Sequence, residues 1–477
     1  MEDIDVLKIL SEYNPWWVTN EVPKEHLQEY HRRSFFTLQR ELDDEKITAI
    51  LGPRRVGKTV LLYQLIKYLL NQGVPSKNIF FLSMDQDKLK NERLGIKDVL
   101  ETYFKLILKI PMGYSTSKTY VFLDEIQASD GWYNTLKNLW DLKYNLKFVV
   151  SGSSTMAISK GAMESLLGRV TQFIVLPFKF SEVLEHDGVL DKSISFALRN
   201  AFSESISKGD PKVLYNLFSD TLSRVISDKD KIEINLDRYL MVGGYPEFLK
   251  ETDDNKISKI TKEKLKFTFY QDIVRFYKLR NAEALDALFY MISSTVGTKF
   301  NISNTARDLD IERPTVKSYL KYLEDIFLIS GVEFYSKSRR SRYRKNRKLY
   351  ITDVGVRNSV LGKLGITVFD NPAEMGVIAE CFAFDHLKRL KFILGLGVDP
   401  GIFYWKNSKE VDFILDIYGV VIPIEVKYQN SVSVKDTGLP EFISKFDSSF
   451  GILLSKDTFD IAGKIIIIPM WLFFLMV

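Results

Sequence analysis

The stretch ITAILGPRRVGKTVLLYQLIKYLL (residues 47–70) decides the fold of the first part of this 477-residue chain. Its opening residues form a short apolar run that predicts a buried strand, and apolar side chains recur at helical spacing from Lys58 to about Asn71. Between them, GPRRVGKT (residues 52–59) matches G-x-x-x-x-G-K-[ST] at every defined position, in the strand-then-helix context that this pattern requires. The stretch therefore predicts a P-loop, which is a main-chain cradle for phosphate groups.

The P-loop predicts that the chain binds a nucleoside triphosphate with magnesium. Glycines let main-chain N–H groups turn inward, and the helix N-terminus adds partial positive charge. Lys58 would reach the β- and γ-phosphates, and Thr59 would place its hydroxyl on magnesium. The alternative is an unrelated glycine turn before a helix. The predicted nucleotide-binding residues are Gly52, Pro53, Arg54, Arg55, Val56, Gly57, Lys58, Thr59 and Val60.

Three further apolar runs predict strands: NIFFLSM (residues 78–84), TYVFLDE (119–125) and LKFVVSGSS (146–154). Helical segments separate them, and this alternation indicates βαβ units with a parallel sheet.

Two acids, Asp124 and Glu125, end the third of these four strands. A carboxylate at the carboxyl end of a neighbouring parallel strand lies near the phosphates. Asp124 would hold magnesium through water, and Glu125 would act as the general base on the attacking water. The alternative is a pair of solvated acids at a strand end.

Two more residues are candidates around the γ-phosphate. Ser151, at the end of the fourth strand, would orient the γ-phosphate or the water; the alternative is a hydroxyl-rich turn at residues 151–154. Arg169, in LLGRV, would contact the γ-phosphate in cis or from a neighbouring subunit and stabilise the transition state. The alternative is a surface arginine.

A second constellation lies in the C-terminal part. Glu425 and Lys427 sit two apart on the strand PIEVKY, so they point to the same side, and Asp412 on the strand EVDFILDI would join them. Asp412 and Glu425 would hold magnesium, which would activate water, and Lys427 would position that water or stabilise charge. A half-exposed strand also shows this alternation of charge.

Five segments in this order, GPRRVGKT, FLDEIQ, VVSGSS, LLGRV and MVGGYPEFL (residues 241–249), resemble the AAA-type archaeal and bacterial ATPases often called the archaeal ATPase group. The resemblance runs from about residue 30 to the end. It implies an ATPase core, a helical lid, a winged-helix segment and a C-terminal domain of restriction-endonuclease-like, PD-(D/E)xK type. In that type Glu380, Asp412, Glu425 and Lys427 match the catalytic positions. Residues 187–232 depart from the pattern, because they are longer and more charged.

Residues 302–329 resemble a helix-turn-helix. Ser303 is the expected N-cap of the first helix, and Pro314 falls in the first turn of the second, where its missing N–H is harmless. The alternative is a small helical packing module. The second helix would carry three basic residues towards a DNA groove: Arg313, Lys317 and Lys321.

A basic run, SKSRRSRYRKNRK (residues 336–348), follows. Such density would neutralise several phosphates and give steep salt dependence, although charge runs are often only solvated loops. It contains Lys337, Arg339, Arg340, Arg342, Tyr343, Arg344, Lys345, Arg347 and Lys348.

The bulk composition is that of an ordinary globular protein, and a net charge of +5 does not by itself indicate nucleic-acid binding. The single cysteine, Cys381, excludes a disulfide framework and a cysteine zinc site, which favours the cytoplasm. The N-terminus does not have the pattern of a signal peptide. The apolar tail at residues 465–477 is shorter than the roughly 20 residues of a membrane span, so a buried edge strand is favoured over a membrane tail.

Together these features predict an α/β protein with a P-loop AAA-type parallel sheet core, and an ATPase that couples turnover to DNA binding or processing, with a metal-dependent nuclease domain. Two alternatives stay open: a regulatory switch whose C-terminal fold only binds DNA or a protein, and a ring-forming DNA translocase. Expected cofactors are ATP and Mg²⁺, and expected partners are ATP and DNA, without a membrane, with a homo-oligomer as an option. The predicted parts are an N-terminal helical segment (1–45), the ATPase core (46–180), a helical lid and connector (181–300), a winged-helix-like segment (301–338) and a nuclease-like domain (339–477).

Overall fold

The computed structural model describes residues 3–86, 94–152, 166–249, 251–268, 279, 281–338, 342, 345–365, 368–394 and 401–477. It divides into two compact units, Met1–Leu176 and Pro177–Val477. The finer division into five parts stays a prediction.

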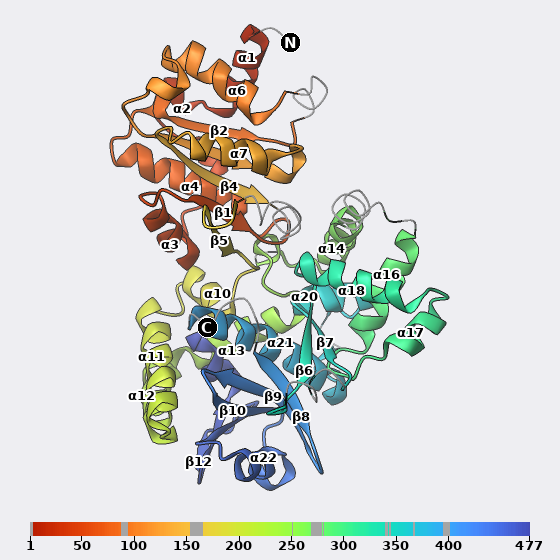
Figure 1. Ribbon diagram of the computed structural model, residues 1–477. Coiled ribbons are helices and arrows are strands. Elements are labelled where there is room, and N and C mark those ends of the chain that lie inside the picture. The colour runs from red at the N-terminus through yellow and green to blue at the C-terminus, as the bar shows by residue number, and fades with distance from the viewer. Residues whose placement is uncertain are drawn as a thin grey trace. The chain divides into compact units, whose positions relative to one another are not determined.

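The first unit contains a five-stranded sheet in the order β2-β3-β4-β1-β5, and every neighbouring pair is parallel (Figure 1). This confirms the predicted parallel sheet. The strands are β1 (Ile47–Leu51), β2 (Ile79–Ser83), β3 (Thr119–Asp124), β4 (Leu146–Gly152) and β5 (Val170–Ile174).

The sheet differs from the expectation in two ways. First, β3 is not a direct neighbour of β1, because β4 lies between them. Second, β5 is a strand that the sequence patterns did not predict. Its sequence, VTQFI, mixes polar and apolar residues, as suits an edge strand whose residues are all partly exposed.

The N-terminal helices cover the other edge strand, β2. The indoles of Trp16 and Trp17 both donate to the carbonyl of Ile79, at 3.0 and 2.9 Å. Asn14 accepts from the amide of Phe81 at 2.6 Å and donates to its carbonyl at 2.8 Å. These contacts satisfy main-chain groups that an open sheet edge would leave unpaired. The helical elements of this unit are α1 (Asp3–Tyr13), α2 (Trp16–Thr19), η1 (Lys24–His26), α3 (Arg33–Glu41), α4 (Lys58–Asn71), η2 (Ser76–Asn78), α6 (Ile96–Tyr103), η3 (Phe104–Leu108), η4 (Met112–Tyr114), η5 (Ile126–Ala128) and α7 (Trp132–Asp141).

The second unit begins with helices, and none of its described residues before 329 lies in a strand. Local signals start many of them: Asp191 and Asp210 each cap a helix by accepting a main-chain N–H. The helical elements up to this point are α10 (Phe180–His186), α11 (Lys192–Lys208), α12 (Pro211–Val225), η6 (Ile226–Asp228), α13 (Lys229–Val242), η7 (Pro246–Phe248), α14 (Asp254–Thr268), α16 (Ala282–Ser294), α17 (Ile302–Asp308) and α18 (Arg313–Asp325).

The helix pair α17 and α18 occupies the region predicted as a helix-turn-helix. The N-cap of α17 is Asn301 and not Ser303: the Asn301 carboxamide oxygen accepts from the amides of Ser303 and Asn304 at 2.9 and 3.1 Å. An asparagine two positions earlier therefore provides the cap that was expected of the serine. Pro314 lies in the first turn of α18, as predicted.

The second unit also holds an eight-stranded sheet in the order β12-β13-β11-β10-β9-β8-β6-β7 (Figure 1). β6 pairs with β7 antiparallel and with β8 in parallel, so the strands that follow α18 belong to the same sheet as the C-terminal strands. The remaining elements are β6 (Ile329–Phe334), β7 (Lys348–Ile351), α20 (Val354–Leu361), α21 (Pro372–Ile393), β8 (Ile402–Lys406), β9 (Glu410–Ile417), β10 (Val420–Lys427), η10 (Val434–Asp436), α22 (Leu439–Phe446), β11 (Gly451–Ser455), β12 (Asp460–Ala462), β13 (Ile465–Pro469), α23 (Met470–Phe473) and η11 (Phe474–Met476).

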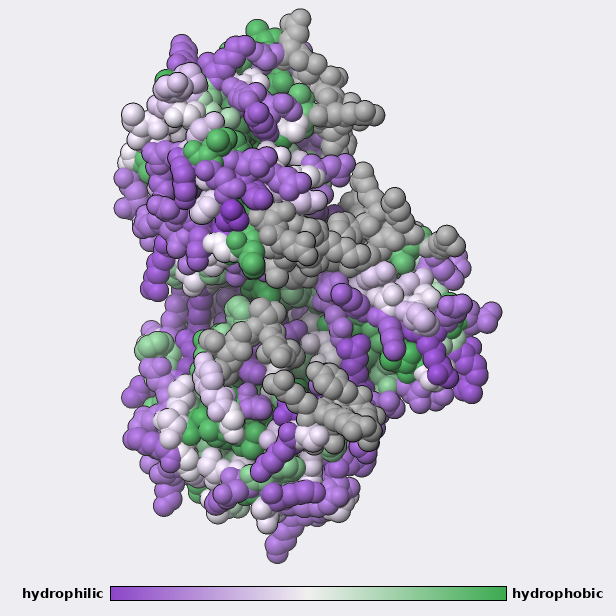
Figure 2. All heavy atoms as spheres, in the orientation of Figure 1, coloured by the Kyte–Doolittle hydropathy of each residue, from purple (hydrophilic) through white to green (hydrophobic). Residues whose placement is uncertain are grey.

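The apolar tail is buried, as predicted, but it is not an edge strand. β13 lies between β11 and β12, and the chain then turns into α23 and η11, whose rings pack on helices of the same unit. Among the residues that are coloured in Figure 2, hydrophilic ones predominate on the face shown. Within the described part of the chain, no helix combines the length and apolar character needed to cross a bilayer.

Candidate functional site

The P-loop lies between the carboxyl end of β1 and the start of α4. Arg55 and Gly57 have φ of 61° and 94°, so the loop turns through left-handed backbone that favours glycine. A Cβ atom on Gly52 would lie 1.9 Å from the carbonyl oxygen of Val175. Both glycines of the motif are therefore required by the local geometry.

Lys58 is buried, and its ammonium group donates to two carbonyls of its own loop, Gly52 O at 3.0 Å and Pro53 O at 2.8 Å. It is thus held in the concave side of the loop, among the groups that would surround a phosphate. Phosphate oxygens are acceptors like these carbonyls, so a bound triphosphate would compete for the same donors.

Thr59, Asp124 and Ser151 form one hydrogen-bonded group at the carboxyl edge of the sheet. The Thr59 hydroxyl donates to one Asp124 oxygen at 2.6 Å, and the Ser151 hydroxyl donates to the other. Because β4 lies between β1 and β3, Ser151 stands on the strand that separates the acid from the P-loop. The hydroxyl and carboxylate oxygens are ligands that suit Mg²⁺.

Glu125 follows with left-handed backbone, at φ 49°. Its amide lies 3.2 Å from Asp124 Oδ1 and 3.3 Å from Ser151 Oγ, and the Gln127 amide group donates to its carboxylate. Burial raises the pKa of Glu125, and the nearby Lys58 ammonium opposes that rise. Gln127 was not among the predicted residues, although it belongs to the FLDEIQ motif.

Arg169 does not join this group. It precedes β5, and its carbonyl accepts from the amide of Ile47 at 2.8 Å, at the amino end of β1. Its side chain pairs with Asp141 at 2.8 Å. It therefore stands at the edge of the sheet opposite the P-loop, so an in-cis role is not supported, and only a role from a neighbouring subunit stays a prediction. Residues 153 and 154 lie outside the described part.

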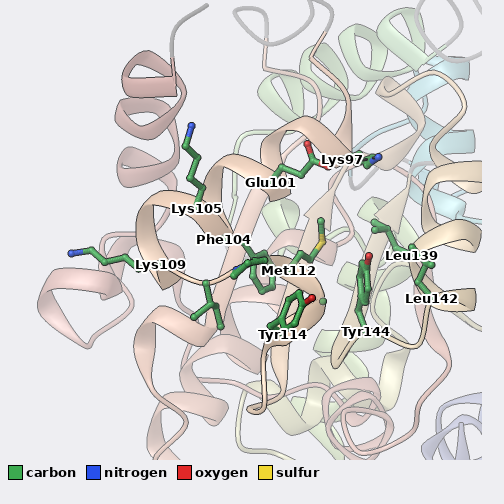
Figure 3. A pocket seen from close by; sticks show the side chains of 13 residues that line it. Lys97, Glu101, Phe104, Lys105, Lys109, Met112, Tyr114, Leu139, Leu142 and Tyr144 are labelled. Atoms are coloured by element: carbon green, nitrogen blue, oxygen red, sulfur yellow. Dashed lines mark ion pairs between the residues drawn. The ribbon is translucent and has the colours of Figure 1, made fainter.

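A groove of about 630 Å³ also lies at this amino edge (Figure 3). Tyr114 and Tyr144, which precede β3 and β4, line it together with Leu142. Two of its lysines already have partners, since Lys97 pairs with Glu101 and Lys105 with Asp3. The groove is separate from the nucleotide site.

The second unit brings the predicted C-terminal residues together. The register of β9 and β10 continues so that Asp412 lies opposite Glu425. The Asp412 carboxylate accepts from the amide of Val426 at 2.9 Å, and the Lys427 ammonium lies 3.0 Å from Glu425 Oε1. Glu425 Oε2 is buried and has no hydrogen-bond partner among the described residues.

Glu380 reaches this group from α21. It accepts from the Tyr350 hydroxyl at 2.6 Å. Burial, together with the charge of Asp412, raises the pKa of Glu380 to about 7 and that of Glu425 to about 8. Burial also raises the pKa of Asp412. Glu380, Asp412 and Glu425, together with Lys348, Glu410 and Lys427, are hereafter called the acid cluster.

Lys348 corrects one expectation. It was assigned to the basic run that would contact phosphates, yet it is buried, with its ammonium 2.5 Å from Glu410 and 3.5 Å from Glu380. It thus balances charge inside the acid cluster. Sequence reasoning missed this role of Lys348, and it missed Tyr350 and Glu410. Lys348 and Tyr350 lie on β7, a strand that the sequence patterns did not predict, and Glu410 lies two residues before Asp412 on β9. Among the described residues, no three acidic, histidine or cysteine side chains gather closely enough to hold a metal.

The remaining basic residues divide into two kinds. Arg313, Lys317 and Lys321 are exposed on α18, whereas its apolar side chains are buried. In the basic run, Arg347 pairs with Glu324 at 2.8 Å, and Arg342 stacks on an aromatic ring. Lys337 and Lys345 also lie near aromatic rings. Predictions on Arg339, Arg340, Tyr343 and Arg344 fall outside the described residues.

Comparison with known families identifies three segments. Residues 44–184 match a family model described as an AAA domain. Residues 233–366 and 375–473 match two models described as domains of unknown function. The first unit thus carries an AAA-type, ATPase-like domain, in agreement with its P-loop and parallel sheet.

Two relatives align over most of their length. An uncharacterized protein of Haemophilus influenzae is 26% identical over 400 residues, which are 83% of this chain and 86% of that protein. An uncharacterized protein of Methanocaldococcus jannaschii is 26% identical over 422 residues, covering 87% and 82%.

Solved structures offer a weaker likeness. The Aeropyrum pernix ORC1 protein in complex with DNA is 14% identical with a TM-score of 0.30, covering 73% of this chain and 96% of its own. The Thermotoga maritima RuvB Holliday junction branch migration motor is 13% identical with a TM-score of 0.23, covering 67% and 91%. Scores this low carry no argument about this chain.

Proposed function

We propose that this protein is an ATPase that couples nucleotide turnover in its first unit to DNA binding or processing by its second. The observation that carries the proposal is that Asp124 and Ser151 lie beside Lys58 and Thr59 of the P-loop, at one edge of a parallel sheet. The AAA-type domain at residues 44–184 supports the same conclusion.

In this proposal each residue has one task. The P-loop amides and Lys58 bind the phosphates, and Thr59 with Asp124 holds Mg²⁺. The metal, when bound, neutralises charge on the phosphate oxygens. Ser151 holds Asp124 in place, and Glu125 accepts the proton of the attacking water. The raised pKa of Glu125 makes it a stronger base than an ordinary carboxylate.

The test is phosphate release by the full chain with ATP and Mg²⁺, with and without duplex and single-stranded DNA. Turnover that changes on adding DNA supports coupling. Turnover that does not respond to either form would contradict coupling and leave the ATPase proposal standing. Absence of turnover, with no nucleotide binding, would refute the ATPase proposal itself.

The support for DNA as the partner is the exposed basic face of α18, where Arg313, Lys317 and Lys321 stand beside one another at helical spacing. If α18 binds a protein instead, neutralising these residues leaves DNA affinity unchanged. That outcome would favour the regulatory switch.

A second candidate function is metal-dependent cleavage of DNA by the acid cluster. The buried Glu425 Oε2 supports it, because a cation would satisfy this oxygen and offset the mutual repulsion with Asp412. Asp412 and Glu425 would hold Mg²⁺, which supplies an activated water, and Lys427 would stabilise charge on the phosphate. Cleavage assays with Mg²⁺ or Mn²⁺ test it, using Asp412→Asn and Lys427→Met as variants; cleavage that both variants retain would refute it.

A ring-forming translocase is the remaining alternative. It requires Arg169 to act on the nucleotide of a neighbouring copy. Light scattering of the full chain with ATP and Mg²⁺ reports ring assembly, and Arg169→Ala would then reduce turnover only in the assembled form. A monomer under all conditions would remove this alternative.

A further inference from the structure

The chain leaves β5 through residues 175–180, hereafter the junction. In the first unit, the junction is fastened directly to the P-loop. The amide of Val175 donates to Leu51 O at 2.7 Å, and Val175 O lies so close to Gly52 that no side chain would fit there. Arg32, which is buried, donates through one nitrogen to Val56 O at 3.2 Å and to Leu176 O at 2.9 Å. Arg32 thereby joins the middle of the P-loop to the junction.

In the second unit, three side chains and one main-chain carbonyl fasten the rest of the junction. Arg389 donates to Pro177 O at 2.6 Å, and the Tyr239 hydroxyl donates to Phe178 O at 2.7 Å. The amide of Phe178 donates to Gly244 O at 2.6 Å. The fourth contact, at 3.0 Å, runs from the amide of Phe180 to the ring nitrogen of His386, which burial keeps neutral by lowering its pKa.

These contacts also explain the two glycines of MVGGYPEFL, a motif to which the proposed function gives no task. A Cβ atom on Gly244 would lie 2.1 Å from Phe178 O, and one on Gly243 would lie 2.1 Å from an Asp353 oxygen. The Asp353 carboxylate in turn accepts from the amide of Gly244 at 2.9 Å. In this glycine pair, Gly244 therefore leaves room for Phe178 of the junction, and Gly243 leaves room for the carboxylate that holds Gly244.

The two sets of contacts hold consecutive residues of the chain. Leu176 is held in the first unit and Pro177 in the second. The proline ring fixes its own φ and restricts the residue before it to extended backbone. A main-chain shift at Leu176 would therefore reach Pro177 through the peptide bond that joins them.

Nucleotide binding would provide such a shift. Lys58 now donates to the carbonyls of Gly52 and Pro53, and a triphosphate would draw the ammonium away from them. Because Gly52 packs against Val175 without spare room, a rearranged Gly52 carbonyl displaces the start of the junction.

We propose that Arg32 is a positioning residue that links nucleotide occupancy of the P-loop to the junction, and that the junction relays this state to the glycine pair and α21 of the second unit. The inference rests on the proposed ATPase function and specifies how its two units communicate.

Hydrogen exchange of the full chain, with and without Mg²⁺ and a non-hydrolysable ATP analogue, tests the relay. In the native protein the analogue slows exchange in the P-loop and changes it at the amides of Phe178, Phe180 and Gly244. Arg32→Lys keeps the charge, but its ammonium is one atom nearer the main chain than the guanidinium nitrogen that bridges Val56 O and Leu176 O, so it falls short of both carbonyls. The P-loop effect then remains and the distal change is lost. Arg40→Lys, at another arginine on the neighbouring helix α3, is the matched control and behaves like the native protein.

The outcomes separate the two proposals. A protected P-loop without any change at the junction or the glycine pair overturns the relay and leaves the ATPase proposal intact, and so does a full distal change in Arg32→Lys. No protection of the P-loop overturns both. If circular dichroism shows that Arg32→Lys is unfolded, Tyr239→Phe decides: it keeps the ring and removes the donor to Phe178 O, so a full distal change at Gly244 in this variant overturns the relay.

Discussion

The P-loop and the acid cluster, both proposed above to act on phosphate groups, handle charge in opposite ways. At the P-loop, one buried ammonium and a ring of main-chain groups lie within a single continuous segment, and the acid beside them is satisfied by two hydroxyls. In the acid cluster, acids from α21, β9 and β10 crowd together, and burial and mutual repulsion raise their pKa values.

The difference shows where each site depends on its surroundings. The P-loop is formed by one continuous segment, so its geometry depends on few residues: glycine at two positions and one lysine. The acid cluster exists only when β7, β9, β10 and α21 have come together. It carries an electrostatic cost that Lys348 and Lys427 offset. Single substitutions at the P-loop should therefore abolish ATP turnover. Single substitutions in the acid cluster should instead change the pKa values of the remaining acids and the stability of the second unit.

The largest effect is expected at Lys58. Lys58→Ala removes the ammonium that meets the phosphates, and ATP turnover should fall by about 10²–10³-fold or more. Phosphate release measures it, with Lys67→Ala, an exposed lysine on the same helix, as the control. Turnover equal to that of the control would contradict the assignment of the site.

The next largest effect separates chemistry from binding. Glu125→Gln removes the proposed base and keeps the shape, so kcat should fall by about 10²-fold or more while the affinity for ATP stays within a few-fold. Steady-state kinetics and titration with a fluorescent ATP analogue measure the two quantities. A Glu125→Gln enzyme with native kcat would show that another group accepts the proton.

The acid cluster should make the second unit less stable as pH rises. Its folded pKa values of about 7 for Glu380 and about 8 for Glu425 exceed the ordinary value of 4.5, so the folded state holds these protons more tightly. Their stabilising contribution is complete below about pH 4.5 and is lost as pH rises to about 8, by at most about 1.4 kcal/mol per pH unit for each proton.

Hydrogen exchange of β9 and β10 across this pH range, in the presence of a chelator, measures that loss. Asp412→Asn removes the charge that, after burial, contributes most to raising both pKa values, and should make the dependence shallower. Asp416→Asn, on the same strand, should leave it as steep as in the native protein. Equal slopes in the two variants would mean that Asp412 does not govern the acid cluster.

The smallest effect is expected on α18. Changing Lys317 and Lys321 to glutamine should lower the slope of log affinity for DNA against log salt by about 0.9 for each phosphate that the lysines no longer neutralise. Fluorescence anisotropy at several salt concentrations gives the slope, and Lys259→Gln, on α14, is the control. An unchanged slope would argue that α18 binds a protein.

Sequence reasoning was most successful where chemistry is local. GPRRVGKT predicts its own loop, and α4 spans the predicted residues, because the motif and its flanking strand and helix are contiguous. It missed β5, since a partly exposed edge strand lacks an apolar run. It also placed Lys348 on the surface, because nothing in a run of basic residues distinguishes the one that turns inward. Arg32 carried no signal, as its partners are main-chain carbonyls without a side-chain pattern.

The double pairing of β6 has a practical consequence for dissecting the protein. A fragment of residues 339–477 would begin after β6 and would leave β8 without its parallel partner at Phe403 and Tyr404. It would also lack Tyr335, whose ring packs on Phe403 and Phe442. The uncovered strand would offer its main chain to other copies, so insolubility of such a fragment would report a severed sheet and say nothing about cleavage chemistry.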